Sequence, residues 1–258
     1  MRIYRENRWT DIHSIYMTFG SAVHAALETL KDPSLKNQRP PIDVVKETFE
    51  KTFRTKYGKI RELDKKQFSD KDINNFVTAG LRMIDDIDKC MELATAEVLF
   101  TEHKLMEPIS RTDDVDIKFK GFIDIVIRTK NKFGKSVVWI CDYKTCSWGW
   151  TKEKKTDEDL LAQLRLYKHF FSKKFNLDPK YVKTAFILLK RVPKKGEPAV
   201  QWLPISSGNK TTMRAVNNLN EAITGMNAND YKKNRNACIN AFGDACPFKG
   251  TYLCVDDD

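Results

Sequence analysis

The clearest chemical pattern in this sequence is a carboxylate and an ammonium group two residues apart, in Asp142-Tyr143-Lys144. Residues two apart in a β-strand face the same side, so a strand here would present both groups together. The carboxylate can hold a divalent cation, while the lysine can orient or help deprotonate a water and offset charge growing on a phosphate. The same letters recur at Asp230-Tyr231-Lys232, so the pattern alone does not identify a site.

The surroundings distinguish the copy at Asp142. It follows the apolar run 137–141, where an aspartate would emerge at the carboxyl end of a buried strand, whereas other copies of the pattern lie in polar stretches. Upstream, Asp124 lies inside the apolar segment 121–127. An unpaired carboxylate buried there would be costly, so Asp124 needs a metal, a cation or strong hydrogen bonds. A structural salt bridge is the simplest alternative.

The two aspartates are expected on neighbouring strands. The segments 117–127 and 137–143 are rich in β-branched and aromatic residues, and a turn is expected around 131–134. Strands joined by a short turn lie side by side, which would bring Asp124 and Asp142 close enough to share a metal. Like charges at that separation favour a cation between them.

The remaining hydrophobic periodicity predicts a helical N-terminal part followed by a mixture of strands and helices. Helices are expected near 19–30, 42–53, 73–91, 156–175 and 213–226, with further strands near 97–100, 181–190 and 199–203. The simplest account is one α/β domain over 1–258. It would comprise a helical section (1–95), a catalytic sheet core (96–205) and a C-terminal helix with a cysteine-containing tail (206–258).

Composition is that of a globular protein with a basic excess. Hydrophobic residues make up 41% and charged residues 31%, and the formal net charge is +10. Lysine and arginine on one surface can replace counterions on nucleic acid, so the charge favours DNA as a partner over a basic protein without one. Apolar runs are too short to span a membrane and no secretory signal is apparent, which indicates a cytoplasmic location with reduced cysteines.

Gly121-x-Ile123-Asp124 followed by Asp142-x-Lys144-Thr145 resembles the core of the PD-(D/E)xK nucleases in their RecB-type branch. Residues 19–28 are similar to the helical motif of that branch, in which the histidine, here His24, is a metal ligand. Gln163 and Tyr167 match its Gln-x-x-x-Tyr motif, and their spacing places both on one helix face. The resemblance covers roughly residues 19–254.

The resemblance implies a restriction-endonuclease-like fold, with a central mixed β-sheet flanked by helices. It also implies that His24, Asp124 and Asp142 hold Mg²⁺ or Mn²⁺ with the Tyr143 carbonyl. Lys144 would position the attacking water, and Gln163 and Tyr167 would orient Lys144 or the DNA. Glu102 stands where many members carry an acidic residue on the preceding strand.

Each of these residues has an ordinary alternative. His24 could be a helix histidine with satisfied hydrogen bonds, Gln163 and Tyr167 could be surface residues, and Glu102 could be a charge partner. The order of the motifs along the chain favours the nuclease. The expected function is a metal-dependent DNA exonuclease acting on ends or single strands in recombination, repair or CRISPR adaptation, in a microbial or viral (phage-encoded) setting. The alternative is a DNA-binding or assembly subunit with an inactive nuclease centre.

Cys238, Cys246 and Cys254 lie close together near the C-terminus, and Cys246-Pro247 is similar to the closing motif of iron–sulfur members of the branch. Those members bind a [4Fe–4S] cluster with a further cysteine upstream of the histidine helix. No cysteine precedes His24 here, so a zinc site and reduced structural cysteines remain alternatives. Trp148 and Trp150, beside Lys152 and neighbouring lysines, are candidates for stacking on unpaired bases.

Overall fold

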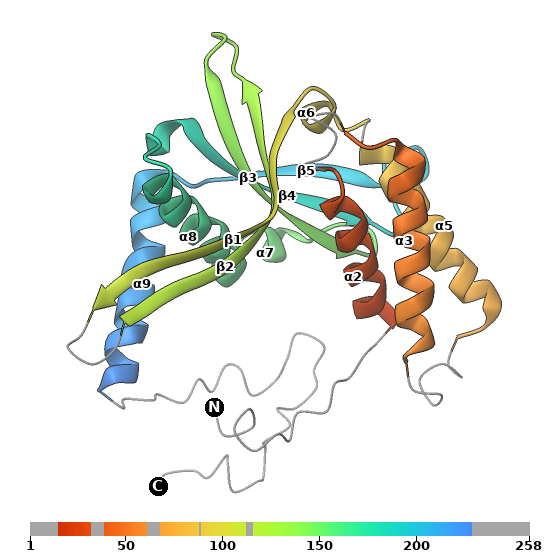
Figure 1. The fold of residues 1–258 in the computed structure, drawn as a ribbon, viewed down its shortest axis with the longest axis horizontal. Coiled ribbons are helices and arrows are strands. Elements are labelled where there is room, and N and C mark those ends of the chain that lie inside the picture. The colour runs from red at the N-terminus through yellow and green to blue at the C-terminus, as the bar shows by residue number, and fades with distance from the viewer. Residues whose placement is uncertain (1–14, 32–38, 61–67, 88, 112–115, 229–258) are drawn as a thin grey trace, which may run out of the picture. The chain divides into compact units, whose positions relative to one another are not determined.

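The computed structural model describes residues 15–31, 39–60, 68–87, 89–111 and 116–228 (Figure 1). The chain forms two compact units, Met1–Val216 and Asn217–Asp258. The first unit contains the sheet and its helices. The described part of the second is the carboxyl-terminal portion of α9 (Asn209–Asn227). The expectation of a single nuclease domain over 1–258 stays a prediction.

A five-stranded sheet with the order β1-β2-β3-β4-β5 forms the centre of the first unit. The strands are β1 (Glu97–Arg111), β2 (Asp116–Lys130), β3 (Ser136–Cys146), β4 (Val182–Lys190) and β5 (Val200–Ile205). Neighbouring strands are antiparallel except β3 and β4, which are parallel. A parallel pair needs a crossover between its strands, and the segment between β3 and β4 supplies it.

Helix α8 (Glu158–Lys174) makes that crossover. It begins at an N-cap, Asp157, whose side chain accepts hydrogen bonds from the Asp159 and Leu160 N–H groups. Glu158 and Asp159 follow in the first turn, where carboxylates favour the positive end of the helix dipole. The short helix α7 (Lys152–Lys155) precedes it, and the 3₁₀ turn η2 (Pro179–Tyr181) returns the chain to β4.

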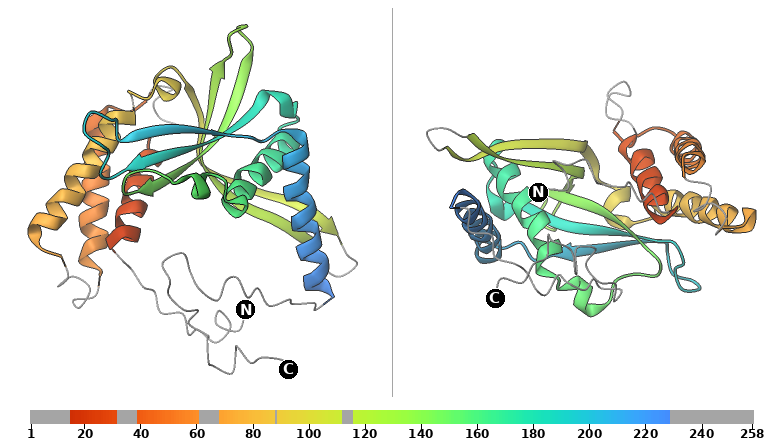
Figure 2. Two further views of the ribbon diagram at one scale, coloured as in Figure 1. Left: turned by 180° about the vertical axis from the view of Figure 1, so that it is seen from behind. Right: turned by 90° about the horizontal axis from the view of Figure 1, so that it is seen from below.

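The N-terminal helices pack on the face of the sheet opposite α8. Figures 1 and 2 show these helices grouped together beside the sheet. They are α2 (Ile15–Glu28), α3 (Ile42–Gly58), α5 (Asp70–Ile87) and the short α6 (Met91–Ala94). Their contact is aromatic: Phe19 packs edge-on against Phe49, Phe53 and Phe76, at centroid distances of 5.9, 6.1 and 5.4 Å. The same core continues into the apolar side chains of β2, β3 and β4 on that face.

A mixed sheet flanked by helices, with an N-terminal helical part, confirms the predicted restriction-endonuclease-like fold class. Several elements are longer than the sequence indicated. Helix α2 begins at Ile15, because Ile15 and Phe19 lie one turn apart and are both buried. Strand β1 continues to Arg111, because it pairs with β2 along a hairpin whose polar residues hide the alternation.

None of the helices in the described ranges combines the length and the apolar character needed to cross a bilayer.

Candidate active site

Asp124 and Asp142 lie at the point where the β2–β3 ladder ends. The ladder runs from Lys130 and Ser136 to the pair Ile125 and Cys141, and the two aspartates are the next residues along each strand. Beyond the last paired residues, the Tyr143 N–H donates to the side chain of Asp124 in place of a backbone carbonyl, with a distance of 2.7 Å to Oδ2. The Asp124 side chain is therefore fixed against the backbone of the neighbouring strand.

Asp142 is more deeply placed than the sequence indicated. The apolar run suggested an aspartate emerging at a strand end, but β3 continues to Cys146 because β4 pairs with it as far as Lys190. The side chain of Asp142 is only 4% exposed. Burial, followed by the charge of Asp124, raises the pKa of Asp142 to about 6 although Lys144 opposes the shift. The site thus holds two like charges in a place that water barely reaches.

Lys144 faces the same side of β3 as Asp142, as the strand alternation predicts. Its ammonium Nζ lies 2.7 Å from Asp142 Oδ2. Within the described residues that oxygen is buried and accepts no hydrogen bond of good geometry, so the contact is an ion pair. The Lys144 ammonium is therefore the group that faces this oxygen of Asp142.

A chain of hydrogen bonds joins Lys144 to helix α8. Lys144 Nζ donates to Gln163 Oε1 at 3.4 Å, and Gln163 Nε2 donates to the Tyr167 hydroxyl at 3.1 Å. Gln163 and Tyr167 are one turn apart on α8, so the helix presents both toward the sheet. The structure brings these residues together with Lys144 in one network.

Close contact between α8 and β2 fixes the position of Tyr167. A Cβ atom added to Gly121 would lie 2.5 Å from Tyr167 Cε1, a separation that only a shift of the ring could relieve. Glycine at this position lets the tyrosine ring lie directly on the strand backbone. The glycine that precedes Asp124 by three residues in the sequence motif thus has a packing role.

His24 enters the site from α2. Its Nδ1 lies 3.6 Å from Asp124 Oδ2, and its ring meets that of Tyr143 edge-on with centroids 5.8 Å apart. Burial alone would lower the pKa of His24, but the hydrogen bond and charge of Asp124 outweigh it, so the pKa is raised. Helix α2 packs closely on β3 here, since a Cβ on Gly20 would lie 3.1 Å from Thr145 Oγ1.

Glu28 joins this site and was not singled out from the sequence. It lies one turn after His24 on α2, and both line a pocket of 460 Å³ together with Gly20, Ser21, Ala25 and Lys56. Burial, opposed by His24 and reinforced by the charge of Asp124, raises the pKa of Glu28. The available signal was the spacing of four between a histidine and a glutamate, which places both on one helix face.

Glu102 lies opposite Asp124 on β1, between the paired positions Thr101 with Ile125 and His103 with Ile123. Its φ is 45°, a conformation that non-glycine residues rarely adopt and that clusters at functional sites. Burial raises the pKa of Glu102, and the charges of Glu28, Asp124 and Asp142 add to the shift. We call Glu28, Glu102, Asp124 and Asp142 the acidic cluster.

The chemistry of the acidic cluster fits a divalent cation. Carboxylate oxygens with an imidazole nitrogen suit Mg²⁺ or Mn²⁺, and mutual repulsion would be relieved by a cation. In the part of the chain that the structure describes, no three His, Cys, Asp or Glu side chains stand together at metal-ligand distances. The Lys144 ammonium instead occupies the open side of Asp142. A cation would therefore have to replace part of that ion pair.

The two tryptophans after β3 differ sharply. Trp148 is 70% exposed, as a base-stacking residue must be. Trp150 is 8% exposed, packs on Phe186 at a centroid distance of 4.9 Å and carries the Lys154 ammonium over its ring. The expectation that Trp150 stacks on bases is wrong, because its ring closes the core beneath β4.

The cysteines proposed as cluster ligands, Cys238, Cys246 and Cys254, lie outside the described residues. Cys90, Cys141 and Cys146 are the cysteines that the structure describes, and Cys141 is fully buried in the apolar core. Burial raises its thiol pKa well above the ordinary value, as it does that of Cys90, to about 11. These thiols are in the wrong environment for easy metal ligation.

The mixed sheet with an aspartate pair, a lysine and a histidine meeting beside it defines a nuclease of the restriction-endonuclease-like class. A family model for the PD-(D/E)XK nuclease superfamily matches residues 2–251, and the chain belongs to that superfamily. A comparison with curated proteins finds no match. Nucleases of this superfamily typically use Mg²⁺ or Mn²⁺. A nuclease of this superfamily would act on DNA.

Proposed function

We propose that the protein is a metal-dependent DNA exonuclease of the RecB-type branch, with its active site at the acidic cluster. The observation that carries the proposal is the convergence of Asp124, Asp142 and Lys144 with His24 from a separate helix. The proposed setting is recombination, repair or CRISPR adaptation in the cytoplasm of a microbial cell or virus-infected host, with a phage origin and with protein partners from those processes.

His24, Asp124 and Asp142, with the Tyr143 carbonyl, would hold Mg²⁺ or Mn²⁺. Bound there, the cation would supply Lewis-acid stabilisation of the charge that develops on the phosphate. Asp124 is already oriented by the Tyr143 N–H, which leaves its second oxygen for the ion. Glu28 and Glu102 add negative charge around the site and would strengthen its affinity for a cation.

Lys144 would orient the attacking water and stabilise negative charge on the phosphate. Its ammonium can serve in this role because it is held from two sides, by Asp142 and by Gln163. When Asp142 binds a metal cation instead of Lys144, the hydrogen bond from Lys144 to Gln163 would keep the ammonium in position. Preorganisation of this kind reduces the rearrangement needed in the transition state.

DNA would approach from the side on which Trp148 is exposed. This tryptophan follows β3, a few residues beyond Lys144, and α7 carries Lys152, Lys154 and Lys155 next to it. Stacking of an unpaired base on an exposed tryptophan with lysines on adjacent backbone phosphates is a common mode of single-strand binding. The net charge of +10 is consistent with such a partner.

The test is cleavage of end-labelled single- and double-stranded DNA with Mg²⁺ or Mn²⁺. We expect degradation by the wild type and none by Lys144→Ala or Asp142→Ala, with DNA binding retained in both variants. The labelled products would separate exonucleolytic from internal cleavage. Equal activity in the wild type and Lys144→Ala would contradict the proposal, and binding without cleavage in the wild type would favour an inactive centre on a DNA-binding or assembly subunit.

We further propose that Cys238, Cys246 and Cys254 hold a [4Fe–4S] cluster. The support is their spacing and the Cys246-Pro247 sequence, which is similar to the closing motif of iron–sulfur members of the branch. Iron and sulfide analysis of anaerobically purified protein, with visible absorbance, would test the proposal. A colourless preparation free of iron would contradict it.

A further inference from the structure

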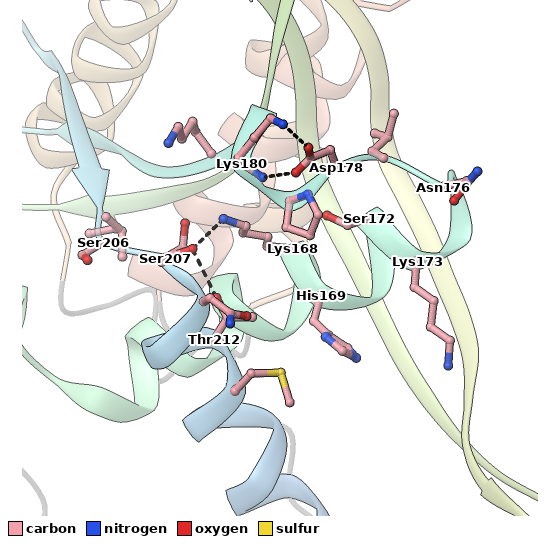
Figure 3. Close-up of a pocket in the computed structure, with 17 residues that line it drawn as sticks. Lys168, His169, Ser172, Lys173, Asn176, Asp178, Lys180, Ser206, Ser207 and Thr212 are labelled. Carbon is pink, nitrogen blue, oxygen red and sulfur yellow. Dashed lines mark hydrogen bonds and ion pairs between the residues drawn. The ribbon is translucent and has the colours of Figure 1, made fainter.

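A second pocket lies beside the carboxyl-terminal half of α8, and none of its lining residues belongs to the acidic cluster. Its volume is 930 Å³, within the range of small-molecule sites. It is enclosed by α8, the loop through η2, the start of β4 and the connection from β5 to α9 (Figure 3). All of its lining residues belong to the first compact unit. We call it the basic pocket.

Lysine side chains dominate the basic pocket. Lys168 is buried, at 5% exposure, and its Nζ donates to the Ser207 carbonyl at 2.5 Å. Burial, and after it the charge of Lys183, lowers the pKa of Lys168 to about 8. The acidic residue of the lining, Asp178, is already ion-paired with Lys180 at 2.6 Å. Among the described residues that line the pocket, the buried ammonium faces another lysine and a carbonyl oxygen, and the carboxylate is already paired with Lys180, which favours an anion.

Ser172 provides an independent indication of a ligand. It is 4% exposed, lines the pocket one helical turn beyond Lys168, and appears among the side chains drawn around it in Figure 3. Within the described residues its Oγ is buried and has no hydrogen-bond partner. A buried hydroxyl without a partner is costly and uncommon, and rotation of the Ser172 side chain about χ1 toward the pocket would let a ligand oxygen satisfy it.

The amino-terminal end of α9 supplies further donors. The helix begins at Asn209, has no acidic residue in its first turn, and contributes Gly208 and Asn209 to the pocket lining. Free N–H groups and the helix dipole favour an anion at such an end. A Cβ on Gly208 would meet nothing within 4 Å, so the space in front of this end is open.

We propose that the basic pocket binds the phosphate of a nucleotide, with Lys168, Lys183 and Ser172 contacting the phosphate oxygens. The pocket is much larger than a phosphate ion, and apolar side chains of Leu177, Ile205 and Met213 provide a surface for a base or sugar. The phosphate preference stands on the pocket itself, whereas the choice of a deoxynucleotide rests on the proposed nuclease function. Such a ligand would be either a released product or the phosphorylated end of a DNA strand.

Calorimetric titration of the full chain in metal-free buffer tests the proposal. We expect deoxyadenosine 5′-monophosphate to bind saturably and deoxyadenosine to bind at least about tenfold more weakly, since charge-assisted hydrogen bonds would be absent. Lys183→Ala and Ser172→Ala should each weaken binding of the monophosphate several-fold. Lys183 is exposed, so its replacement leaves the fold intact. Lys104→Ala, an exposed lysine on β1 outside the pocket, is the matched control.

Equal affinity for the nucleoside and the nucleotide, or unchanged affinity in Lys183→Ala, would overturn the proposal. Asp142→Ala should bind the monophosphate as the wild type does, and loss of binding in that variant would move the ligand to the acidic cluster and also overturn it. An oligonucleotide with a 5′-phosphate that competes better than its 5′-hydroxyl form would assign the pocket to strand ends, and equal competition would assign it to free nucleotides. Nucleotide binding without DNA cleavage would contradict the proposed nuclease function and would leave the proposed nucleotide site standing.

Discussion

Helix α8 lies between two pairs of like charges, each with one buried member, and the protein compensates the two pairs differently. At the acidic cluster, Asp142 and Asp124 repel each other, yet an ammonium and an imidazole lie within 4 Å of them. At the basic pocket, Lys168 and Lys183 repel each other, and the nearest compensation for Lys168 is a neutral carbonyl oxygen. The first group is partly neutralised by the protein, whereas the second is left for an anion from outside.

The comparison separates the two sites by the charge compensation that is present before any ligand binds. At the acidic cluster, the Lys144 ammonium and the Tyr143 N–H hold Asp142 and Asp124 in place before a metal arrives. At the basic pocket, the unpaired Ser172 hydroxyl and the lowered pKa of Lys168 indicate that the described residues supply no such compensation. The two sites can be distinguished by substitutions that are chemically the same but differently located.

Removal of one aspartate from each site gives the largest expected contrast. Asp124→Ala should reduce DNA cleavage by at least about 10³-fold, because it removes both a proposed metal ligand and the acceptor of the Tyr143 N–H. Asp178→Ala should leave cleavage within about twofold and tighten nucleotide binding, because it releases Lys180 from its ion pair. Steady-state cleavage rates and calorimetry would measure both, and equal losses of cleavage would contradict the separation of the sites.

Glycine substitutions provide the next contrast. Gly121→Ala must displace the Tyr167 ring, so we expect a loss of about 1–3 kcal/mol in unfolding free energy from overpacking and a clear loss of cleavage. Gly208→Ala adds a methyl group in open space, and the unfolding free energy should change by no more than about 0.5 kcal/mol. Urea denaturation tests the pair. A harmless Gly121→Ala would show that α8 is not tightly seated on β2.

Asp142→Asn should stabilise the metal-free protein while abolishing cleavage. The folded state raises the pKa of Asp142 from 3.8 to about 6, so ionisation destabilises the fold. That cost is absent below about pH 4 and complete above about pH 6. We expect a gain of about 1–3 kcal/mol at pH 8, because the net shift already includes the opposing effect of Lys144. The gain should shrink at pH 5, and a destabilised variant at pH 8 would contradict the repulsion.

Lys183→Ala is the corresponding change at the basic pocket and has the smallest expected effect on stability. The fold lowers the pKa of Lys168 from 10.5 to about 8. Below about pH 8 Lys168 carries its charge in the folded protein, and that charge reduces the stability of the fold. Because Lys183 is exposed and screened by solvent, removal of its charge should stabilise the ligand-free protein by no more than about 0.5 kcal/mol at pH 7. The gain should vanish above about pH 10, where Lys168 is neutral. Thermal unfolding at both pH values measures it.

The candidate site was largely readable from the sequence because its residues have local signals. Asp142 and Lys144 are two apart on a strand, Gln163 and Tyr167 are four apart on a helix, and Asp124 interrupts an apolar strand. Glu28 was missed although its spacing from His24 was visible, because a glutamate on a helix is usually solvated. Trp150 was misjudged because its burial depends on Phe186, a residue of another strand.

The basic pocket had no sequence signal at all. Its lysines come from α8, η2 and β4, and each reads as solvated charge in its own segment. The burial of Lys168 appears only when the β5–α9 connection packs over it, with the Ser207 carbonyl in contact with its ammonium. The orphaned hydroxyl of Ser172 likewise depends on what surrounds it in space and not on its neighbours in the chain.

The fold class, the superfamily and the order of the strands and helices along the chain follow from the amino-acid sequence, since hydrophobic periodicity and short motifs are local properties of the chain. The burial of Asp142, the positive φ of Glu102 opposite Asp124 and the gathering of lysines beside α8 could be known only from the three-dimensional fold. Burial and electrostatic repulsion depend on every element that packs around a group, and that information is not carried by any one segment.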